Sequence, residues 1–414
     1  MGIDAEKKKT CTRIRVVCFV TLKHTRARQK KMHCLPTDCM HSVFWFLSLS
    51  DMARASAVCK DWLGTMRSLR PRPQISVQIF KPRNNLHLDT CATSFLSAHI
   101  TVLDIMHIVD MKQLRAFLES HLNVRCFKMR SPYYSYPLTF GMSFVEALRA
   151  NQNMTDLNIS GYADNLETMN ALSHVFAQCH NLTRLAISNV YNNSDDDELS
   201  LREFVSFLQS SVNLTDLSIT NRFRNAQMIQ LATGIGACKT LRSVNVSENL
   251  FNQSGMHALA DAIQLNKNIT CLNVSYIDVS GEGLVLLSHA LCATKKLVQL
   301  NMAVCQLTNA DVRLVAKILA SNPDMERLIL PSNMLNDESL HHLTQAIQKH
   351  PRIHHVNLFH NRISCSGALN LIQAFLKKTP HDGKIYINLE MNNIQNAYVL
   401  RNMVRPWSNA RVFF

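Results

Sequence analysis

The stretch Met325–Lys349, MERLILPSNMLNDESLHHLTQAIQK, decides the fold because it joins two hydrophobic periods in one short segment. Leu328 and Leu330 are two positions apart, which places both on one face of a short strand. Asn333 follows at a turn, and apolar residues then recur at helical spacing at Leu340, Leu343 and Ile347. One strand and one helix of this size cannot bury their own apolar faces, so the segment needs neighbours of the same kind.

The same unit recurs along most of the chain at a regular interval. Its first apolar strand residue falls at Ile100, Val124, Met154, Leu182, Leu214, Leu241, Ile269, Leu297, Met325 and Ile353, and an eleventh, irregular copy runs through Ile387, Leu389 and Asn392. A period near 28 residues with an L-x-x-L-x-L strand resembles the leucine-rich repeat of the ribonuclease-inhibitor-like class. The resemblance covers roughly residues 75–414 and implies an α/β solenoid, a horseshoe with one helix per repeat.

Composition narrows the class of protein. The chain has 414 residues, of which 47% are hydrophobic, and no apolar run approaches the roughly 20 residues of a membrane-spanning helix. The 13 cysteines form no C-x-x-C pair and no regular spacing, and several lie within apolar patterns. We therefore expect reduced core thiols, a reducing compartment in the cytoplasm or nucleus, and no membrane partner.

The positive charge of the chain is concentrated at its start. Residues 1–32 hold ten Lys and Arg against Asp4 and Glu6, a net +8, which leaves +6 of the total +14 for the other 382 residues. The basic balance therefore gives no reason to expect a nucleic-acid partner. We predict a basic disordered tail over 1–32. A nuclear-import or acidic-surface patch, and an over-extended start with Met32 as the initiator, remain open.

Residues 33–73 carry no leucine-rich register. They combine Leu35-Pro36-Thr37-Asp38, an apolar Phe44-Trp45-Phe46-Leu47, a Ser50-Asp51 turn and the ending Val58-Cys59-Lys60-Asp61-Trp62. These elements, at these spacings, closely resemble the F-box. The residues depart from the family pattern with Met40 and Met52 at positions where Leu or Ile is commoner. A helical cap on the first repeat is the alternative interpretation, and both can hold at once.

The resemblance implies a specific set of partners. F-box proteins dock on the Skp adaptor of a cullin–RING ubiquitin ligase, and the remainder of the chain selects a protein substrate. Some apolar positions of the family pattern pack inside the box and others contact the adaptor. The residues that match these positions are Leu35, Pro36, Val43, Phe44, Leu47, Val58 and Trp62.

Side chains between the apolar strand residues are predicted to point to the opposite, concave face. One such column is rich in asparagine: Asn158, Ala186, Ser218, Asn245, Asn273, Asn301, Ile329, Asn357 and Asn388. The flanking column varies in charge and size: Asp156, Arg184, Asp216, Ser243, Cys271, Gln299, Arg327 and His355. From these we predict substrate contacts at Arg184, Asp216, Asn245, Asn273, Gln299, Asn301, Arg327, His355 and Asn357. An internally satisfied asparagine ladder is the alternative.

Other polar groups are interpreted as structural or left open. A second asparagine series at the turns, Asn249, Asn333, Asn361 and Asn392, with Cys305 in the same position, is predicted to satisfy loop backbone groups. Two loops, Pro132–Pro137 with its three tyrosines and the acidic Asp195–Glu198, could serve recognition or simply be local packing and a solvated loop.

No catalytic pattern emerges from the sequence. It has no glycine-rich phosphate loop, no G-x-S-x-G and no H-E-x-x-H, and the spacing of His350, His354, His355 and His360 does not place them on one helical face. We therefore predict a non-catalytic substrate adaptor without metal or cofactor. The alternatives are an interaction scaffold without ligase function and a GTPase activator of the Ran type, which uses the same repeat.

Overall fold

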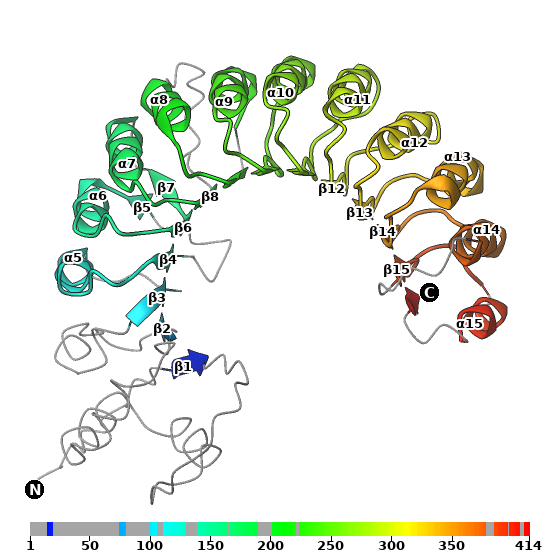
Figure 1. The fold of residues 1–414 in the computed structure, drawn as a ribbon, viewed down its shortest axis with the longest axis horizontal. Helices are drawn as coiled ribbons and strands as arrows, with labels where there is room; N and C mark the ends of the chain where they lie inside the picture. The colour runs from blue at the N-terminus through cyan, green and yellow to red at the C-terminus, as the bar shows by residue number, and fades with distance from the viewer. Residues whose placement is uncertain are drawn as a thin grey trace, which may run out of the picture. The chain divides into compact units, whose positions relative to one another are not determined.

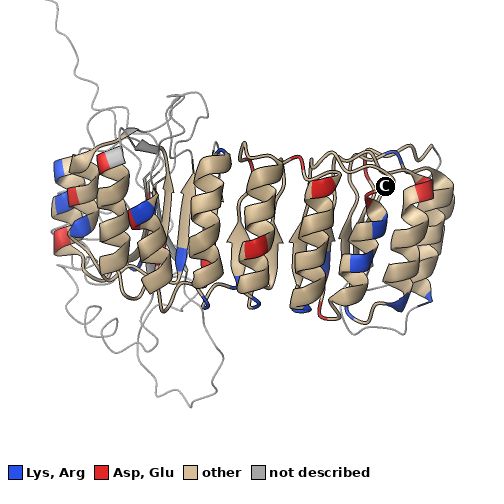
Figure 2. Cartoon of the chain, turned by 90° about the horizontal axis from the view of Figure 1, so that it is seen from above, with Lys and Arg blue, Asp and Glu red and all other residues tan. Residues whose placement is uncertain are grey.

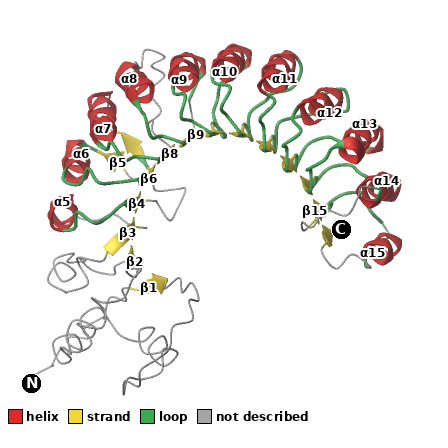
Figure 3. Cartoon of the chain, viewed as in Figure 1, coloured by secondary structure: helices red, strands yellow, loops and turns green. Residues whose placement is uncertain are grey.

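The computed structural model describes residues 15–19, 74–79, 100–105, 111–129, 139–163, 166–188, 201–220, 223–377, 385–395, 397–405 and 410–414. The chain divides into two compact units, Met1–Leu182 and Thr183–Phe414. Both are built from parallel strands that alternate with helices along the chain (Figures 1 and 3).

The first unit begins with an antiparallel pair and continues as a parallel ladder. Strand β1 (Arg15–Phe19) pairs antiparallel with β2 (Gln74–Ile79). Strands β3 (Ile100–Ile105), β4 (Cys126–Met129) and β6 (Asp156–Ser160) then follow in parallel register. Its described helices are α5 (Met111–Ser120), α6 (Met142–Arg149) and α7 (Leu166–Gln178). Two short strands, β5 (Thr139–Phe140) and β7 (Tyr162–Ala163), form a separate pair.

Strand β1 departs from the prediction of a disordered tail over residues 1–32. Of that segment the structure describes only Arg15–Phe19, and it pairs these five residues with β2. The core of β1, Val16-Val17-Cys18-Phe19, is the apolar stretch of an otherwise charged segment. β-branched and aromatic residues favour strand pairing, which accounts for this exception. The rest of the segment lies outside the described residues.

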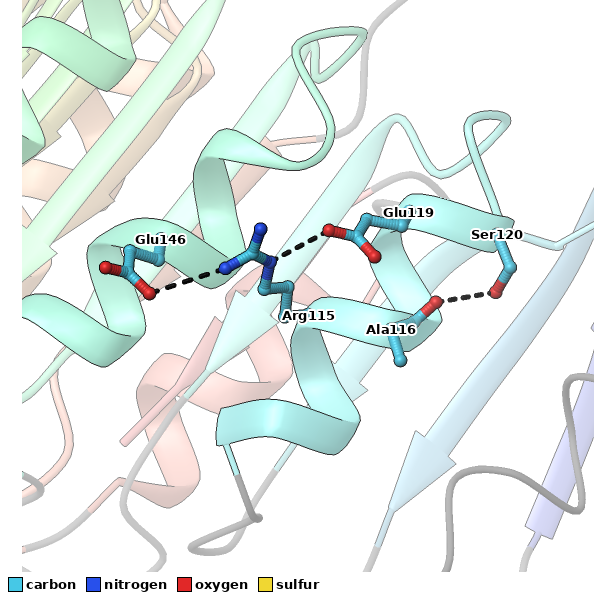
Figure 4. A network of polar contacts seen from close by, with 5 residues as sticks. All are labelled: Arg115, Ala116, Glu119, Ser120 and Glu146. Carbon is cyan, nitrogen blue, oxygen red and sulfur yellow. Dashed lines mark hydrogen bonds and ion pairs between the residues drawn. The ribbon is translucent and has the colours of Figure 1, made fainter.

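Aromatic side chains fill the core of the first unit. Phe117, Phe127 and Phe144 are at most 1% exposed, and Phe140 stacks on Phe144 with ring centroids 4.3 Å apart. On the exposed side, Arg115 of α5 donates to Glu119 at 2.8 Å and reaches Glu146 of α6 at 3.5 Å (Figure 4). Because these charges are exposed, we expect the pairs to contribute little to stability. Phe140, which is 2% exposed, is a core residue. The tyrosine loop before it lies outside the described residues.

The second unit contains the most regular repeats. Its strands are β8 (Arg184–Ser188), β9 (Asp216–Thr220), β10 (Ser243–Asn245), β11 (Cys271–Asn273), β12 (Gln299–Asn301), β13 (Arg327–Ile329), β14 (His355–Asn357), β15 (Ile385–Asn388) and β16 (Ala410–Phe413). Its described helices are α8 (Arg202–Ser210), α9 (Asn225–Ala237), α10 (Gln253–Leu265), α11 (Glu282–Thr294), α12 (Val312–Ser321), α13 (Asp337–Lys349), α14 (Cys365–Leu376) and α15 (Tyr398–Val404).

Within this second unit the strands line the inner, concave side and the helices the outer side (Figure 1). Leu328 and Leu330 are fully buried, as their spacing predicts, and so are Leu340, Leu343 and Ile347 of α13 at 1% exposure or less. The strands pair in parallel and in equivalent register, for example Leu300 with Leu328 and Leu328 with Val356. The predicted α/β leucine-rich-repeat solenoid is therefore confirmed. Among the described helices, none has the length and hydropathy needed to cross a membrane.

The turn asparagines form the hydrogen-bonded ladder that the sequence predicts. Asn333 donates from Nδ2 to the carbonyls of Met302, Leu330 and Pro331 at 3.0–3.2 Å, and its Oδ1 accepts from the N–H groups of Cys305 and Leu307. Asn249, Asn361 and Asn392 repeat this arrangement. Cys305 occupies the turn position that asparagine holds in the other repeats. Its thiol donates a hydrogen bond to the Val274 carbonyl at 3.2 Å, and burial raises the pKa of this thiol to about 12.

A second polar ladder follows the helices, and the sequence pattern did not reveal it. Asn266 donates to the carbonyls of Ile235 and Cys238, and Asn322 donates to those of Leu291 and Ile318. His350 takes the equivalent place in the next repeat. Its Nε2 lies 2.9 Å from the Asn322 carbonyl, and its Nδ1 accepts from the N–H groups of Arg352 and Ile353. Both ring nitrogens of His350 are thus used within the fold.

Asp337 links two neighbouring helices. Its carboxylate accepts hydrogen bonds from the backbone and hydroxyl of Ser364, the hydroxyl of Ser366 and the N–H of Gly367 at the start of α14. Burial by itself raises the pKa of this carboxyl, but these hydrogen bonds outweigh burial, and the pKa lies below its ordinary value. The charged form is therefore favoured by folding.

We expect Asp337→Asn to lower stability by about 1 kcal/mol at neutral pH, because it removes one acceptor and the charge at a helix N-terminus. A carboxyl with a lowered pKa contributes stability above the ordinary value near 3.9 and loses it as the pH falls through the folded value. The difference between wild type and variant in urea unfolding should shrink between pH 5 and pH 3. A constant difference over that range would contradict this role.

Candidate functional site

Two parallel columns of side chains cross the concave face of the second unit. We call the first the mixed column, and strand register aligns it as Arg184, Asp216, Ser243, Cys271, Gln299, Arg327, His355, Tyr386 and Arg411. The second, the asparagine column, lies two residues further along each strand: Ala186, Ser218, Asn245, Asn273, Asn301, Ile329, Asn357, Asn388 and Phe413. Buried residues separate the two columns on every strand of the second unit from β8 to β15.

The amides of the asparagine column all adopt one orientation. Each Oδ1 accepts a hydrogen bond from the backbone N–H two positions later, at 2.9–3.1 Å: Asn245 from Ser247, Asn273 from Ser275, Asn301 from Ala303, Asn357 from Phe359 and Asn388 from Glu390. Because the partner is a backbone donor, the amide atom that faces it must be the oxygen. The NH₂ end of each amide is therefore the end left for another partner.

The asparagine ladder is only partly satisfied from within. Asn245 donates from Nδ2 to the Ser218 hydroxyl at 2.9 Å. Within the described part of the chain, the Nδ2 atoms of Asn273, Asn301, Asn357 and Asn388 donate to no protein atom. These four side chains are partly exposed, so their donors are open to a ligand. An internally satisfied column, the alternative interpretation of the sequence, is thus limited to Asn245.

The mixed column carries both signs of charge and several sizes of side chain. Arg184 and Arg327 are exposed, whereas Asp216, Gln299 and His355 are partly exposed. Burial, followed by electrostatic interaction with Arg327 and His354, lowers the pKa of His355 and so favours its neutral imidazole. Figure 2 shows that residues of both signs of charge occur along the described helices and loops.

Aromatic rings gather where the two columns reach the last strands. His355 stacks on Tyr386 with ring centroids 4.2 Å apart and planes 12° from parallel. The ring centroids of Tyr386 and Phe413 are 5.4 Å apart, and Phe413 is 37% exposed. Phe359, partly exposed, follows Asn357 on the next turn of the chain. We call the concave residues of β13–β16, with Phe359, the aromatic segment.

The structure brings all nine predicted substrate residues onto this one face. Arg184, Asp216, Gln299, Arg327 and His355 lie in the mixed column, and Asn245, Asn273, Asn301 and Asn357 in the asparagine column. Their role in binding stays a prediction. The predicted adaptor residues, Leu35, Pro36, Val43, Phe44, Leu47, Val58 and Trp62, lie outside the described residues.

Sequence reasoning missed three members of the face: Tyr386, Arg411 and Phe413. Tyr386 precedes Ile387, whose burial the eleventh repeat copy predicts, so alternation from Ile387 could have found it. Arg411 and Phe413 belong to β16, whose sequence ARVF has no L-x-x-L pattern. Their position follows only from the pairing of β16 with β15.

Comparison with protein families addresses the segment before the solenoid. Residues 32–73 match the family model described as F-box domain. The chain carries an F-box domain. Its position agrees with the prediction from Leu35-Pro36 and Val58-Cys59-Lys60-Asp61-Trp62, and the protein combines an F-box with a leucine-rich-repeat solenoid.

Comparison with solved structures gives matches of low sequence identity. A protein from Bacteroides fragilis is 11% identical, with a TM-score of 0.39, and the match covers 75% of this chain and 70% of that one. TLR13, in its complex with ssRNA13, is 14% identical, with a TM-score of 0.44, and the match covers 73% of this chain and 41% of that one.

Proposed function

We propose that this protein is a substrate-recognition adaptor of an SCF-type cullin–RING ubiquitin ligase. The observation that carries the proposal is the presence, in one chain, of an F-box domain at residues 32–73 and a solenoid with a chemically varied concave face. The F-box would dock on a Skp-type adaptor and thereby on the cullin. The solenoid would hold a protein substrate for ubiquitination and proteasomal degradation.

The concave face is the surface that we assign to the substrate. Curved solenoids commonly use this face for partners. Four asparagine amides offer open donors there, and Arg184 and Arg327 project exposed guanidinium groups, a residue type enriched at interface hot spots. The leucines beneath are needed for the fold, whereas these outward side chains are not.

Charge reversal on this face tests the substrate half of the proposal. The double variant Arg184→Glu with Arg327→Glu should reduce capture of the substrate at least about tenfold, because it replaces two hot-spot cations by anions. The measurement is affinity capture of the tagged full chain from cells treated with a proteasome inhibitor, followed by quantitative mass spectrometry. Thermal stability and adaptor capture should stay close to wild type, since both residues are exposed.

A matched control is a charge reversal on the outer side of the solenoid. Lys317 is exposed on α12, so Lys317→Glu changes the net charge without touching the concave face. It should leave the captured proteins unchanged. If Lys317→Glu loses the same proteins and the concave double variant retains them, the substrate lies on the helical side and our placement is wrong.

A further inference from the structure

The aromatic segment of the concave face differs from the remainder in its chemistry. It combines the stacked rings of His355 and Tyr386, the ring of Phe413, and the amides of Asn357 and Asn388 on adjacent strands. Ile329 adds an apolar side chain on β13 next to Asn357. In the asparagine column the two amides thus lie between the apolar side chains of Ile329 and Phe413.

The hydrogen-bonding groups along this segment are chiefly donors. The Oδ1 atoms of Asn357 and Asn388 are turned back to the N–H groups of Phe359 and Glu390, which leaves their NH₂ groups outward. Arg327 and Arg411 lie at the two ends of the mixed column here and carry donors only. The remaining side-chain acceptors are the Tyr386 hydroxyl, one ring nitrogen of His355 and the exposed Glu390 carboxylate.

A row of donors selects among extended peptides. An ordinary extended segment presents one N–H donor and one carbonyl acceptor per residue, and a buried N–H without a partner weakens binding. Proline has no N–H, so a proline-rich segment presents carbonyls alone. Such a segment adopts the polyproline II conformation, which has no internal hydrogen bonds and leaves every carbonyl available.

We propose that the aromatic segment binds a proline-rich segment in the polyproline II conformation. The amides of Asn357 and Asn388 donate to its carbonyls, and the rings of Tyr386, Phe413 and Phe359 pack against its pyrrolidine rings, the mode of binding in which aromatic grooves exploit a preformed helix. The biological role of this binding rests on the proposed function, because the bound proline-rich peptide would be part of the ubiquitination substrate. The length is suitable: six prolines span about 19 Å, and four strands span about 14 Å between the outer pair.

The test is titration of the full-length protein into fluorescein-labelled hexaproline, followed by fluorescence anisotropy. A labelled (Gly-Ser)₃ peptide of the same length, with its backbone N–H groups present, is the comparison ligand. Hexaproline should bind at least about tenfold more tightly, a difference of about 1.4 kcal/mol. Equal affinity for the two peptides, or no hexaproline binding at millimolar protein, overturns the proposal.

Aspartate substitutions isolate the donors. In the double variant Asn357→Asp with Asn388→Asp, a carboxylate oxygen can still accept the N–H of Phe359 or Glu390. The NH₂ donor of each asparagine is lost. Two lost hydrogen bonds should raise the hexaproline Kd about 5- to 100-fold. The same change at Asn273, which has the same turn bond on β11 outside the aromatic segment, should alter Kd less than about twofold. Unchanged affinity in the double variant, or an equal loss in Asn273→Asp, contradicts the assignment.

The ring and the ligase role are tested separately. Tyr386→Ala should weaken hexaproline binding by about tenfold through loss of the stacked surface, and wild-type affinity in this variant contradicts the proposal. Hexaproline binding requires no ligase subunit. Binding without any capture of a Skp adaptor would refute the proposed function and leave this inference standing, whereas adaptor capture without hexaproline binding would do the reverse.

Discussion

Asn333→Ala should lower the free energy of unfolding by about 3 kcal/mol or more. The Asn333 side chain is 7% exposed and satisfies three backbone carbonyls and two N–H groups from two successive repeats. Each buried backbone group left without a partner costs about 1–3 kcal/mol, and water entry would recover only part of that loss. Urea unfolding followed by circular dichroism, with the midpoint converted through the slope, measures the effect.

The control for this prediction is the same substitution on the concave face. Asn301 satisfies one N–H, that of Ala303, and it is partly exposed, so Asn301→Ala should cost about 1 kcal/mol or less. The contrast separates a structural asparagine from one whose donor is left for a ligand. If Asn333→Ala costs no more than Asn301→Ala, the turn ladder does not have the structural role that its hydrogen bonds indicate.

Leu35→Ala with Pro36→Ala should reduce capture of the Skp adaptor and cullin to background. Both residues belong to the Leu-Pro start of the F-box pattern, to which the proposed function assigns contact with the adaptor. Truncation of an interface hot spot costs about 2 kcal/mol or more, which is at least about 30-fold in affinity. Quantitative immunoblotting of the adaptor after capture of the tagged full chain from cells provides the measurement.

This double variant requires evidence that the solenoid remains folded. Its thermal unfolding and its hexaproline binding should match wild type, since both depend on residues far along the chain from the F-box. The concave variant Arg184→Glu with Arg327→Glu is the reciprocal control, expected to keep the adaptor. Undiminished adaptor capture by the Leu35/Pro36 variant would remove the docking role that we assign to these two residues.

The sequence predicts the fold where its repeat period is regular. Between Leu241 and Arg362 the spacing of leucines, valines and asparagines places strands, turns and helices correctly, because alternation on a strand and 3.6-residue spacing on a helix each bury one face. Strand β16 was missed because the repeat period changes near it. Paired positions are 28 residues apart from Leu328 to Val356, but 31 from Val356 to Ile387 and 25 from Ile387 to Val412, and ARVF carries only the alternation of one short strand. The pairing of β1 with β2 is a contact across more than 50 residues, which no local pattern reports.

The site was predictable as a surface but not as chemistry. Alternation from Leu328 assigns Arg327 and Ile329 to the concave face, and the repeat extends this to the other members. Whether the asparagines satisfy one another depends on how each amide is turned. The N–H of the residue two positions later decides this, because it donates a hydrogen bond and must therefore face the amide oxygen. The stack of His355 on Tyr386 joins two repeats of unequal length, so it required the strand register.

Direct binding of the purified full-length protein to a purified Skp adaptor tests the central claim most directly. Isothermal titration calorimetry should give one adaptor per chain for the wild-type protein, with an affinity at least about 30-fold weaker for Leu35→Ala with Pro36→Ala. The same titration with the concave variant Arg184→Glu and Arg327→Glu should reproduce the wild-type affinity. A wild-type protein that is folded, binds hexaproline and yet shows no heat of binding to the adaptor would contradict the account of this chain as a ligase adaptor.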